Sequence, residues 1–364
     1  MRSSRMDRML ALAQARGLDV LALMPGPNLF YVTGLSFFLS ERPVLGLFPV
    51  DQSPALVLPA LEADKVSDIR TFPYTDEEGY AFAFHEACAA LEIADARIGV
   101  EAFRMRLLES RILQRYAAGS ELVPSDDLFS EMRMRKSPEE LAAMRRAISV
   151  AEHAFQIWLD TLHVGMTEKE AAARLVAALL TNGADALSFD PIVAAGPNGG
   201  LPHAVPGDRP FQAGDWMVVD WGAFVDGYAS DITRMVVFGE PAGQLREMHA
   251  LVLRANEAGR AAVHPGASAE SVDAATRAVI ADAGYGQYFN HRTGHGLGLE
   301  IHEPPFILAG NALSLSPGMT FTVEPGVYFE GVGGIRIEDD VVVTDDGIET
   351  LTTLPRAPFV LSGR

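Results

Sequence analysis

The sequence predicts an α+β protein with two domains, a smaller α/β domain followed by a larger α+β domain. The first observation is composition, because 364 residues with 48% hydrophobic and 21% charged side chains can bury a large core. The second is an alternation of helical and strand-like stretches over the first third of the chain. The third is a change near Met132, after which long helices are separated by strands that carry polar residues.

The predicted first domain spans residues 1–127. Its expected helices and strands are, in chain order, 6–16, 20–24, 45–50, 55–58, 81–91 and 105–116. This alternation favours a compact α/β domain. The sequence of this domain shows no cluster of potentially catalytic residues. The single cysteine, Cys88, lies in an amphipathic helical stretch, so we interpret it as a small core residue and not a nucleophile.

The predicted second domain spans residues 132–364 and begins with a strong helix start. Ser137 is a typical N-cap, Pro138 suits the first helical position, and Glu139 and Glu140 favour the helix dipole. A long helix is therefore expected from Ser137. The later expected helices are 167–180, 245–263 and 268–283.

Charge and hydropathy exclude several classes of partner. The formal net charge of −19 argues against a broad phosphate-binding surface, so nucleic acid is not expected as a partner. A membrane span requires about 18 consecutive apolar residues, and the sequence contains no such run. The basic N-terminus precedes an apolar stretch that Gln14, Arg16 and Asp19 interrupt, which is not typical of a signal peptide. We therefore expect a cytoplasmic protein.

The segment 216–234 is predicted to form a hairpin. Asp226-Gly227 favours a two-residue turn, which pairs position 225 with 228 and position 220 with 233. Asp220 and Asp231 then share one face as diagonal neighbours, with Cβ atoms roughly 7 Å apart. Two such carboxylates repel unless a proton or a cation lies between them. Aspartates that cap turns in solvent are the alternative, but Asp220 follows a buried-looking apolar run.

A glycine-rich segment, 291–305, contains three of the nine histidines of the chain, His291, His295 and His302. A lone histidine is usually a hydrogen-bonded core or surface residue. Three in one stretch where the backbone can approach a ligand closely indicate metal binding or proton transfer.

Two apolar stretches near the C-terminus supply further acids, Glu324 and Glu338. In the second stretch the strand period places Glu338 and Asp340 on the face of Arg336, opposite the apolar side chains. Glu338 is the better ligand candidate, and we interpret Asp340 as a structural acid. Asp339 does not fit the alternation and is expected near an edge or in a local hydrogen bond.

This series of Asp, Asp, His, Glu and Glu resembles the pita-bread metallopeptidases, which include methionine aminopeptidases, aminopeptidase P and prolidase. The resemblance covers about residue 132 to the C-terminus and rests on the phrases 230–234, 295–298 and 324–326. It implies a C-terminal pita-bread domain, preceded by a smaller α/β domain of the creatinase type. It also implies a ligand set in which Asp220 binds one metal, Asp231 and Glu338 bridge two metals, and His295 and Glu324 hold the other.

Two divalent metal ions per chain are the cofactors that this resemblance implies. Four carboxylates and a neutral imidazole carry four negative charges, which balance two divalent cations. Oxygen and nitrogen ligands suit manganese, cobalt, zinc or iron, and we expect manganese first. Paired ions of this kind activate a water and polarise a scissile carbonyl, so the expected reaction is hydrolysis.

The resemblance assigns further residues to the substrate. His203, His302 and Arg336 match family positions around it, and His203 and His302 are expected to hydrogen-bond the substrate or its oxyanion. Glu324 is the expected proton shuttle. His291 is expected to line the same pocket, with a structural role as the alternative.

The expected activity is hydrolysis of the Xaa-Pro bond at the N-terminus of a proline-containing peptide, by a homodimer. A full N-terminal domain, the stretch 28–34 and the run 302–305 all resemble the proline-specific branch. Some prolidases have a basic residue where this chain has Phe306, which favours an aminopeptidase over a dipeptidase. Arg336 or another arginine could still bind the carboxylate of a dipeptide.

Two other classes of function use the same fold. One is a creatinase-like hydrolase or a peptide-binding module without metal, against which the complete ligand set argues. The other is a metal-dependent hydrolase or lyase of a small non-peptide compound. Comparing activity on proline peptides with activity on small amides distinguishes these two classes from the peptidase.

Overall fold

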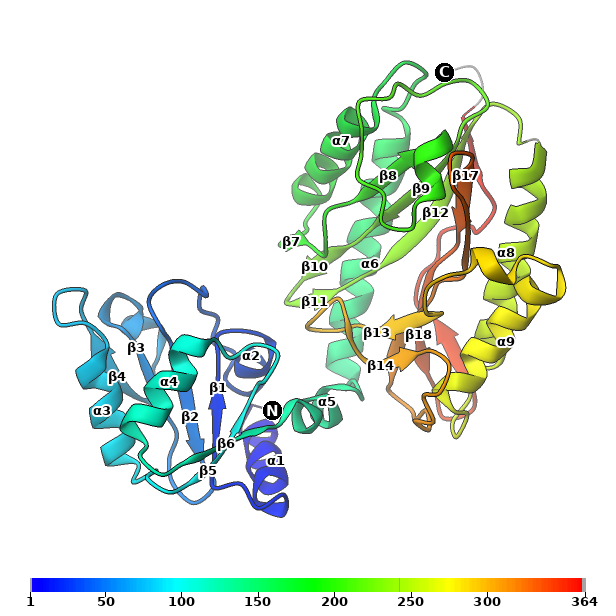
Figure 1. The fold of residues 1–364 in the computed structure, drawn as a ribbon. Coiled ribbons are helices and arrows are strands. Elements are labelled where there is room, and N and C mark those ends of the chain that lie inside the picture. The colour runs from blue at the N-terminus through cyan, green and yellow to red at the C-terminus, as the bar shows by residue number, and fades with distance from the viewer. Residues whose placement is uncertain (1, 242, 362–364) are drawn as a thin grey trace. The chain divides into compact units, whose positions relative to one another are not determined.

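The chain folds into two compact units, Met1–Met132 and Arg133–Arg364. The computed structural model describes residues 2–241 and 243–361. Each unit contains its own helices and sheets, and Figure 1 labels them. The predicted combination of an α/β N-terminal domain and an α+β C-terminal domain is confirmed.

The N-terminal unit is built on a six-stranded sheet in the order β4-β3-β2-β1-β5-β6. The central strand β1 pairs antiparallel with β2 and parallel with β5. The strands are β1 (Val20–Leu23), β2 (Leu45–Pro49), β3 (Ala55–Pro59), β4 (Arg70–Tyr74), β5 (Arg97–Val100) and β6 (Glu121–Pro124). The helices are α1 (Arg2–Ala15), α2 (Pro27–Thr33), η1 (Ala60–Lys65), α3 (Ala81–Ala90), α4 (Leu107–Tyr116) and α5 (Asp126–Arg133).

Alternate residues of this sheet form an apolar core with α3 and α4. Ala22 of β1 and Leu47 of β2 lie in the same cluster as Phe84 of α3 and Leu113 of α4. Cys88 belongs to this cluster, as predicted, and burial raises the pKa of its thiol to about 11. Because the thiolate is the reactive form, Cys88 is chemically inert here.

The C-terminal unit begins with two long helices and ends in strands. Its helices are α6 (Pro138–Leu159), α7 (Glu168–Thr181), η2 (Gly196–Gly200), α8 (Gly243–Ala261), α9 (Ala269–Asp282) and η3 (Gly286–Tyr288). Its strands are β7 (Ala186–Leu187), β8 (Ile192–Ala195), β9 (Trp216–Trp221), β10 (Ala223–Val225), β11 (Tyr228–Ala229), β12 (Ile232–Phe238), β13 (Gly294–Gly296), β14 (Glu303–Ile307), β15 (Thr320–Val323), β16 (Gly326–Phe329), β17 (Gly333–Arg336), β18 (Asp339–Val343), β19 (Ile348–Thr350) and β20 (Phe359–Leu361).

The strands of this unit lie between two pairs of helices, α6 with α7 and α8 with α9 (Figure 1). The main sheets run in the orders β20-β12-β9-β8 and β14-β13-β15-β18-β19. On one face of β9, Trp221 stacks on Phe155 of α6 with ring centroids 4.2 Å apart. On the other face, Val218 of β9 packs in the cluster that contains Val252 of α8. Both faces are buried, which explains the long apolar runs.

The start of α6 follows the prediction from sequence. Ser137 accepts a hydrogen bond from the Glu140 amide, and the Glu140 side chain accepts one from the Ser137 amide. Just before this capping box, the Lys136 ammonium lies 2.8 Å from the Glu303 carboxylate of β14. Arg133 forms a second ion pair with Glu303. This buried ion cluster fixes β14 to the segment that precedes α6.

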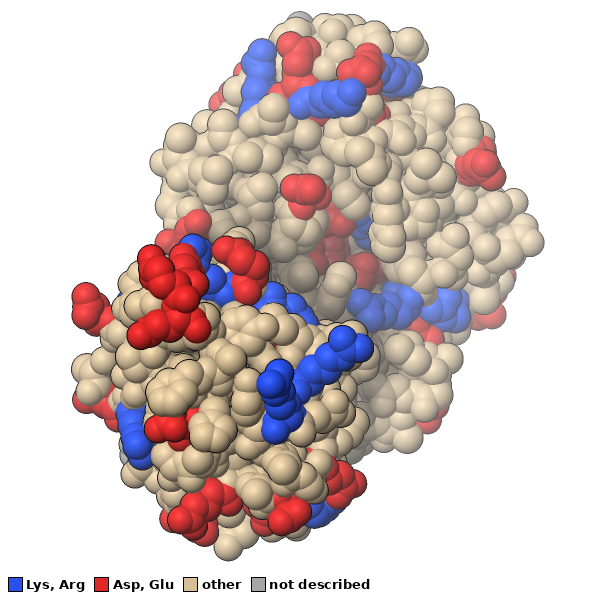
Figure 2. Space-filling view, turned by 60° about the vertical axis from the view of Figure 1, so that its left-hand side comes forward, with Lys and Arg blue, Asp and Glu red and all other residues tan. Residues whose placement is uncertain are grey.

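Charges are dispersed over the surface. On the face in Figure 2, Lys and Arg side chains are interspersed with Asp and Glu side chains among mostly uncharged residues. Within the described ranges, no helix combines the length and the hydrophobicity that crossing a bilayer requires.

Candidate active site

The strands β9 and β12 form the hairpin that the sequence predicts. Asp226 and Gly227 both have positive φ, 52° and 81°, as a tight hairpin turn requires. Val225 pairs with Tyr228, and Asp220 pairs with Thr233. The register therefore places Asp220, Thr233 and Asp231 at one end of a face whose other end, with Val218 and Met235, is apolar core.

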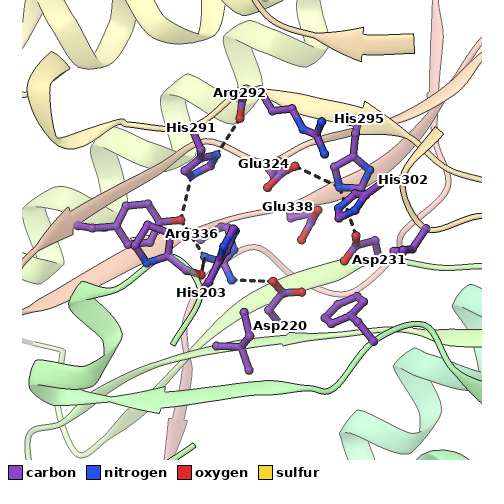
Figure 3. Close-up of a pocket in the computed structure, with 15 residues that line it drawn as sticks. His203, Asp220, Asp231, His291, Arg292, His295, His302, Glu324, Arg336 and Glu338 are labelled. Atoms are coloured by element: carbon purple, nitrogen blue, oxygen red, sulfur yellow. Dashed lines mark hydrogen bonds and ion pairs between the residues drawn. The ribbon is translucent and has the colours of Figure 1, made fainter. Parts of the chain in front are cut away.

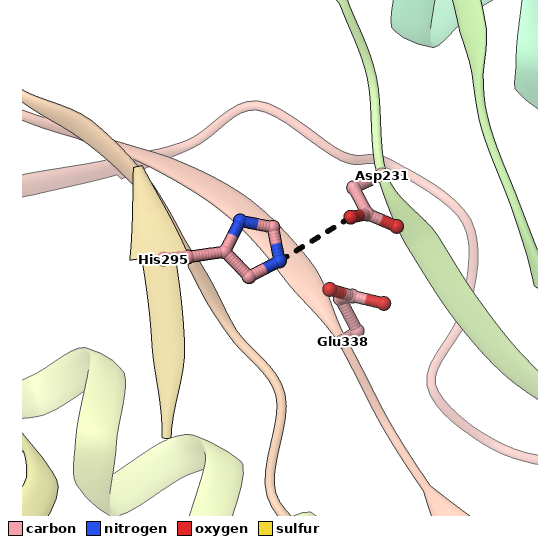
Figure 4. Close-up of side chains that lie close together, drawn as sticks. All are labelled: Asp231, His295 and Glu338. Carbon is pink, nitrogen blue, oxygen red and sulfur yellow. Dashed lines mark ion pairs between the residues drawn. The ribbon is translucent and has the colours of Figure 1, made fainter. Parts of the chain in front are cut away.

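Asp231 precedes β12 and is buried among other acids. Its amide donates a 3.1 Å hydrogen bond to the Asp340 carboxylate, so Asp340 acts as the structural acid that we predict. Its Oδ1 atom is buried without a hydrogen-bond partner among the described residues. Ligand atoms of Asp231, His295 and Glu338 lie within 4.8 Å of one another (Figure 4).

His295 lies on β13, where glycines allow close approach of the neighbouring strands. A Cβ atom at Gly294 would lie 1.8 Å from the Thr322 carbonyl oxygen, so no other residue fits there. The Nδ1 atom of His295 lies 3.2 Å from the Gly296 carbonyl oxygen, which can only accept. Nδ1 thus carries the proton, and Nε2 presents its lone pair to Asp231 at 3.5 Å and Glu324 at 3.4 Å.

Glu324 and Glu338 are each oriented by a threonine. The Thr322 hydroxyl donates to Glu324 at 3.1 Å, and the Thr233 hydroxyl donates to Glu338 at 2.7 Å. Glu338 reaches the site because the strand is interrupted between β17 and β18, and Glu338 lies in this interruption. This interruption corrects the continuous strand from Arg336 to Asp340 that the alternation suggests.

Burial dominates the electrostatics of this cluster. Burial and the neighbouring Glu338 and Asp220 carboxylates raise the pKa of Asp231 well above its usual range. Burial raises the pKa of Glu324 to about 7, and burial with Glu324 raises that of Glu338 well above its usual range. These acids cannot all ionise together without a compensating cation.

Asp220 is bound to Arg336. The Nη2 atom of Arg336 donates to Oδ2 of Asp220 at 2.6 Å, while Oδ1 of Asp220 is buried and lacks a partner among the described residues. Arg336 also donates to Tyr328, Thr233 and the Pro202 carbonyl. Its Nε, Nη1 and Nη2 atoms are therefore all used by protein oxygens.

The three other histidines line the same cavity of about 580 Å³ (Figure 3). His203 is exposed in the loop after η2. His302 lies edge-on to His295, with ring centroids 4.2 Å apart. His291 is engaged by the Tyr328 hydroxyl and the Arg292 carbonyl, and burial with the nearby Arg336 charge lowers its pKa to about 4. The remaining walls include Phe189, Ile192, Ile301 and Arg292.

Two features of the site differ from the sequence interpretation. Asp339 is not at an edge, because it is fully buried between Arg234 at 2.9 Å and Arg356 at 2.7 Å, which lower its pKa despite burial. The strand alternation misses this ion pair because its partners are distant in sequence. Arg292 also lines the cavity, although the sequence analysis gives it no role. Its position between His291 and His295 in the sequence is the signal that points to the cavity.

The chain belongs to the metallopeptidase family M24, whose model matches residues 142–345. A creatinase/prolidase N-terminal domain matches residues 5–135. These matches confirm the resemblance to the pita-bread metallopeptidases and the assignment as a metallopeptidase.

Relatives named as proline-specific peptidases align over nearly the whole chain. A Xaa-Pro dipeptidase of Pyrococcus horikoshii is 31% identical over 97% of this chain and 98% of its own. The crystal structure of a prolidase from Thermococcus sibiricus matches with a TM-score of 0.95 at 32% identity, covering 99% of both chains. An X-Pro aminopeptidase from Thermotoga maritima matches with a TM-score of 0.85 at 33% identity, covering 96% of this chain and 100% of that one.

The family implies divalent metal ions, and the donor set fits them. Carboxylate oxygens and a neutral imidazole are suitable ligands for first-row divalent ions. The unpartnered buried oxygens of Asp220 and Asp231 point to a missing positive charge, because a buried carboxylate otherwise needs a partner.

Proposed function

We propose that this chain is a dinuclear, metal-dependent exopeptidase that hydrolyses Xaa-Pro bonds. The observation that carries the proposal is the convergence of Asp231, His295 and Glu338 within 4.8 Å at the wall of a cavity large enough for a small peptide. The peptidase family and the names of the relatives support the substrate class.

The proposed ligands are Asp220, Asp231, His295, Glu324 and Glu338. When bound, the two ions would lower the pKa of a water and polarise the scissile carbonyl. The protein orients the ligands through Thr233, Thr322 and the Gly296 carbonyl. Manganese as the native metal, homodimerisation and a cytoplasmic location stay predictions from the sequence.

The proposed work of the other side chains is proton transfer and hydrogen bonding. Glu324 carries a proton to the leaving proline nitrogen, a role that its place beside His295 at the cavity wall supports. His203 and His302 hydrogen-bond the oxyanion from the open side of the cavity. His291 and Arg336 are tied to Tyr328, so we propose that they shape the pocket wall.

Removal and restoration of metal test this proposal. Chelation should abolish hydrolysis of Xaa-Pro peptides, and manganese, cobalt, zinc or iron should restore it, with about two ions per chain by elemental analysis. Full activity in a sample shown to be free of metal would favour the creatinase-like alternative. Activity on small amides, with none on proline peptides, would favour the non-peptide hydrolase.

Two observations bear on the length of the substrate. Phe306 is apolar where some prolidases have a basic residue, which favours tripeptides and longer peptides over dipeptides. However, Arg292 lines the cavity, and its guanidinium lies 4.8 Å from the centroid of the Phe306 ring. A positive charge is thus present next to the apolar side chain. Comparing kcat/KM on Xaa-Pro and Xaa-Pro-Xaa substrates decides between a dipeptidase and an aminopeptidase.

A further inference from the structure

We propose that Glu168 is a positioning residue for His203, because its buried carboxylate holds both ends of the loop that carries this histidine. This inference rests on the proposed function and adds to it a residue that does not line the cavity. The loop comprises η2 and the segment that follows it, residues 196–207, and is called the His203 loop below.

The His203 side chain depends on the loop backbone for its position. It is exposed at the cavity (Figure 3) and makes no hydrogen bond with any described residue. Val205, two residues later, is 79% exposed. A surface segment with so few side-chain contacts is mobile unless its backbone is held. An oxyanion donor contributes only when it is fixed where the charge develops. The role proposed for His203 therefore requires a clamp on the backbone of the loop.

Glu168 provides such a clamp with both of its carboxylate oxygens, and it is 1% exposed. Oε1 accepts a 2.7 Å hydrogen bond from the Ala195 amide just before the loop, and Oε2 accepts one from the Gly207 amide at its end, also at 2.7 Å. Oε2 further accepts from the Asn198 side chain at 2.7 Å, and the same Asn198 nitrogen donates to the Val205 carbonyl. Hydrogen bonds to a charged carboxylate are stronger than those between neutral groups, so one side chain closes the loop firmly.

The start of α7 holds Glu168 in its turn. Thr167 is the N-cap, so Glu168 is the first helical residue, where the helix dipole favours a negative charge. The amide of Lys169, the next residue, donates to the Gly207 carbonyl at 3.1 Å. Gly207 is therefore bonded to the helix through both its amide and its carbonyl. A helix terminus is a rigid support for a positioning residue.

The first half of the loop has a second set of supports, on β16 and on Arg336. A Cβ atom at Gly200 would lie 2.4 Å from the Phe329 carbonyl oxygen, so the two backbones are in direct contact. The Pro202 carbonyl accepts from Arg336 at 3.2 Å. Loss of the carboxylate on α7 should therefore release residues 203–207 and leave η2 in place.

A double-mutant cycle between Glu168 and His203 tests the proposal. The metal-loaded enzyme is assayed on an Xaa-Pro peptide that the parent cleaves. Glu168→Gln keeps the size of the side chain but turns an amide N–H₂ group towards N–H donors. It should lower kcat about 10-fold, as for loss of a supporting hydrogen-bond partner. In the His203→Ala background the same change should lower kcat less than about 2-fold, because the side chain that Glu168 positions is gone. Metal content of Glu168→Gln should match that of the parent.

A neighbouring glutamate provides the matched control for general destabilisation. Glu170 lies in the same first turn of α7 and forms a capping box with Thr167, and among the described residues it makes no hydrogen bond with the His203 loop. Glu170→Ala should lower the melting temperature and leave kcat unchanged. Amide hydrogen exchange gives a readout independent of catalysis. Glu168→Gln should accelerate exchange over residues 203–207, and Glu170→Ala should not.

Three results would overturn the proposal. Equal losses of kcat in the parent and His203→Ala backgrounds would mean that Glu168 acts independently of His203. Loss of metal in Glu168→Gln would place its effect at the ligands, and unchanged exchange over residues 203–207 would mean that the carboxylate does not hold the loop. If the metal-loaded parent cleaves no Xaa-Pro peptide, the proposed function fails, and the exchange experiment still decides whether Glu168 holds the loop.

Discussion

At the scale of single residues, the site is a set of acids that is unfavourable without cations. Asp231 and Glu338 are nearly fully buried within reach of each other, and both have raised pKa values because of burial and mutual repulsion. Such an arrangement of buried carboxylates destabilises a metal-free protein and is typical of functional sites. Metal affinity and stability of the metal-free chain should therefore respond in opposite directions to the same substitution.

The Asp231→Asn variant tests whether metal affinity and the stability of the metal-free chain change in opposite directions. We expect the variant to lose more than about 100-fold in metal affinity, because loss of outer hydrogen-bond partners alone costs 10- to 100-fold. The metal-free variant should melt at a higher temperature than the metal-free parent, because one buried carboxylate is gone. Elemental analysis after dialysis and calorimetry measure the two effects. Asp226→Asn, in the exposed turn of the same hairpin, is the matched control.

His203→Ala should separate substrate binding from metal binding. His203 lines the cavity but lies outside the group of clustered ligand atoms. We expect both ions to remain while kcat falls about 100-fold, the usual cost of one oxyanion donor. Loss of an ion in this variant would instead identify His203 as a ligand.

At the scale of elements, the ion cluster around Glu303 holds β14 in place. Glu303 is buried with Lys136 and Arg133, and these two cations lower its pKa although burial raises it. β14 also carries Phe306, which pairs with His295 of β13. The cluster therefore supports both a candidate ligand and the ring beneath Arg292.

Glu303→Gln should destabilise the C-terminal unit by about 3 kcal/mol, because it leaves two buried cations without their counter-charge. Urea unfolding of the metal-saturated protein measures this change. The exposed pair of Glu349 with Arg145 provides the comparison, and Glu349→Gln should cost less than about 1 kcal/mol. Equal costs for the two variants would mean that the Glu303 cluster contributes no more than a surface pair.

Short-range patterns predicted the elements that depend on local chemistry. The N-cap at Ser137 and the Asp226-Gly227 turn are both present, and the turn fixes the register that aligns Asp220 with Thr233. The broken strand around Glu338 and the burial of Asp339 were not predicted. Both depend on partners about 100 residues away, Thr233 and Arg234, which strand alternation cannot reveal.

At the scale of the whole molecule, buried neutral histidines make stability depend on pH. The Nε2 atom of His249 on α8 donates a 3.0 Å hydrogen bond to the Arg356 carbonyl oxygen, and the imidazole ring packs beside Trp216. Burial lowers the pKa of His249 below its ordinary value, and the hydrogen bond to the Arg356 carbonyl opposes this shift only in part. The unfolded chain, with an ordinary histidine pKa near 6.5, therefore binds a proton more readily than the folded chain. Protonation below about pH 6.5 thus favours unfolding.

The unfolding free energy of the metal-saturated protein should fall between pH 7.5 and pH 5.5, and His249→Gln should reduce the fall. The largest effect of one such histidine is about 1.4 kcal/mol per pH unit. Urea unfolding at the two pH values measures it. His264→Gln, at an exposed position, should leave the pH dependence unchanged. An identical slope for parent and His249→Gln would contradict the role of His249.

The long separation between the proposed ligands also has a consequence for folding kinetics. Glu338 is oriented by Thr233, 105 residues earlier in the chain, through an isolated bridge between the two residues. Closing so long a loop requires the intervening helices and strands to be largely formed. An ion that needs both ends of the loop is then bound only after the folding transition state. Saturating manganese should therefore slow unfolding and leave the refolding rate unchanged in urea-jump experiments. The cofactor would then extend the lifetime of the native enzyme without directing how it forms.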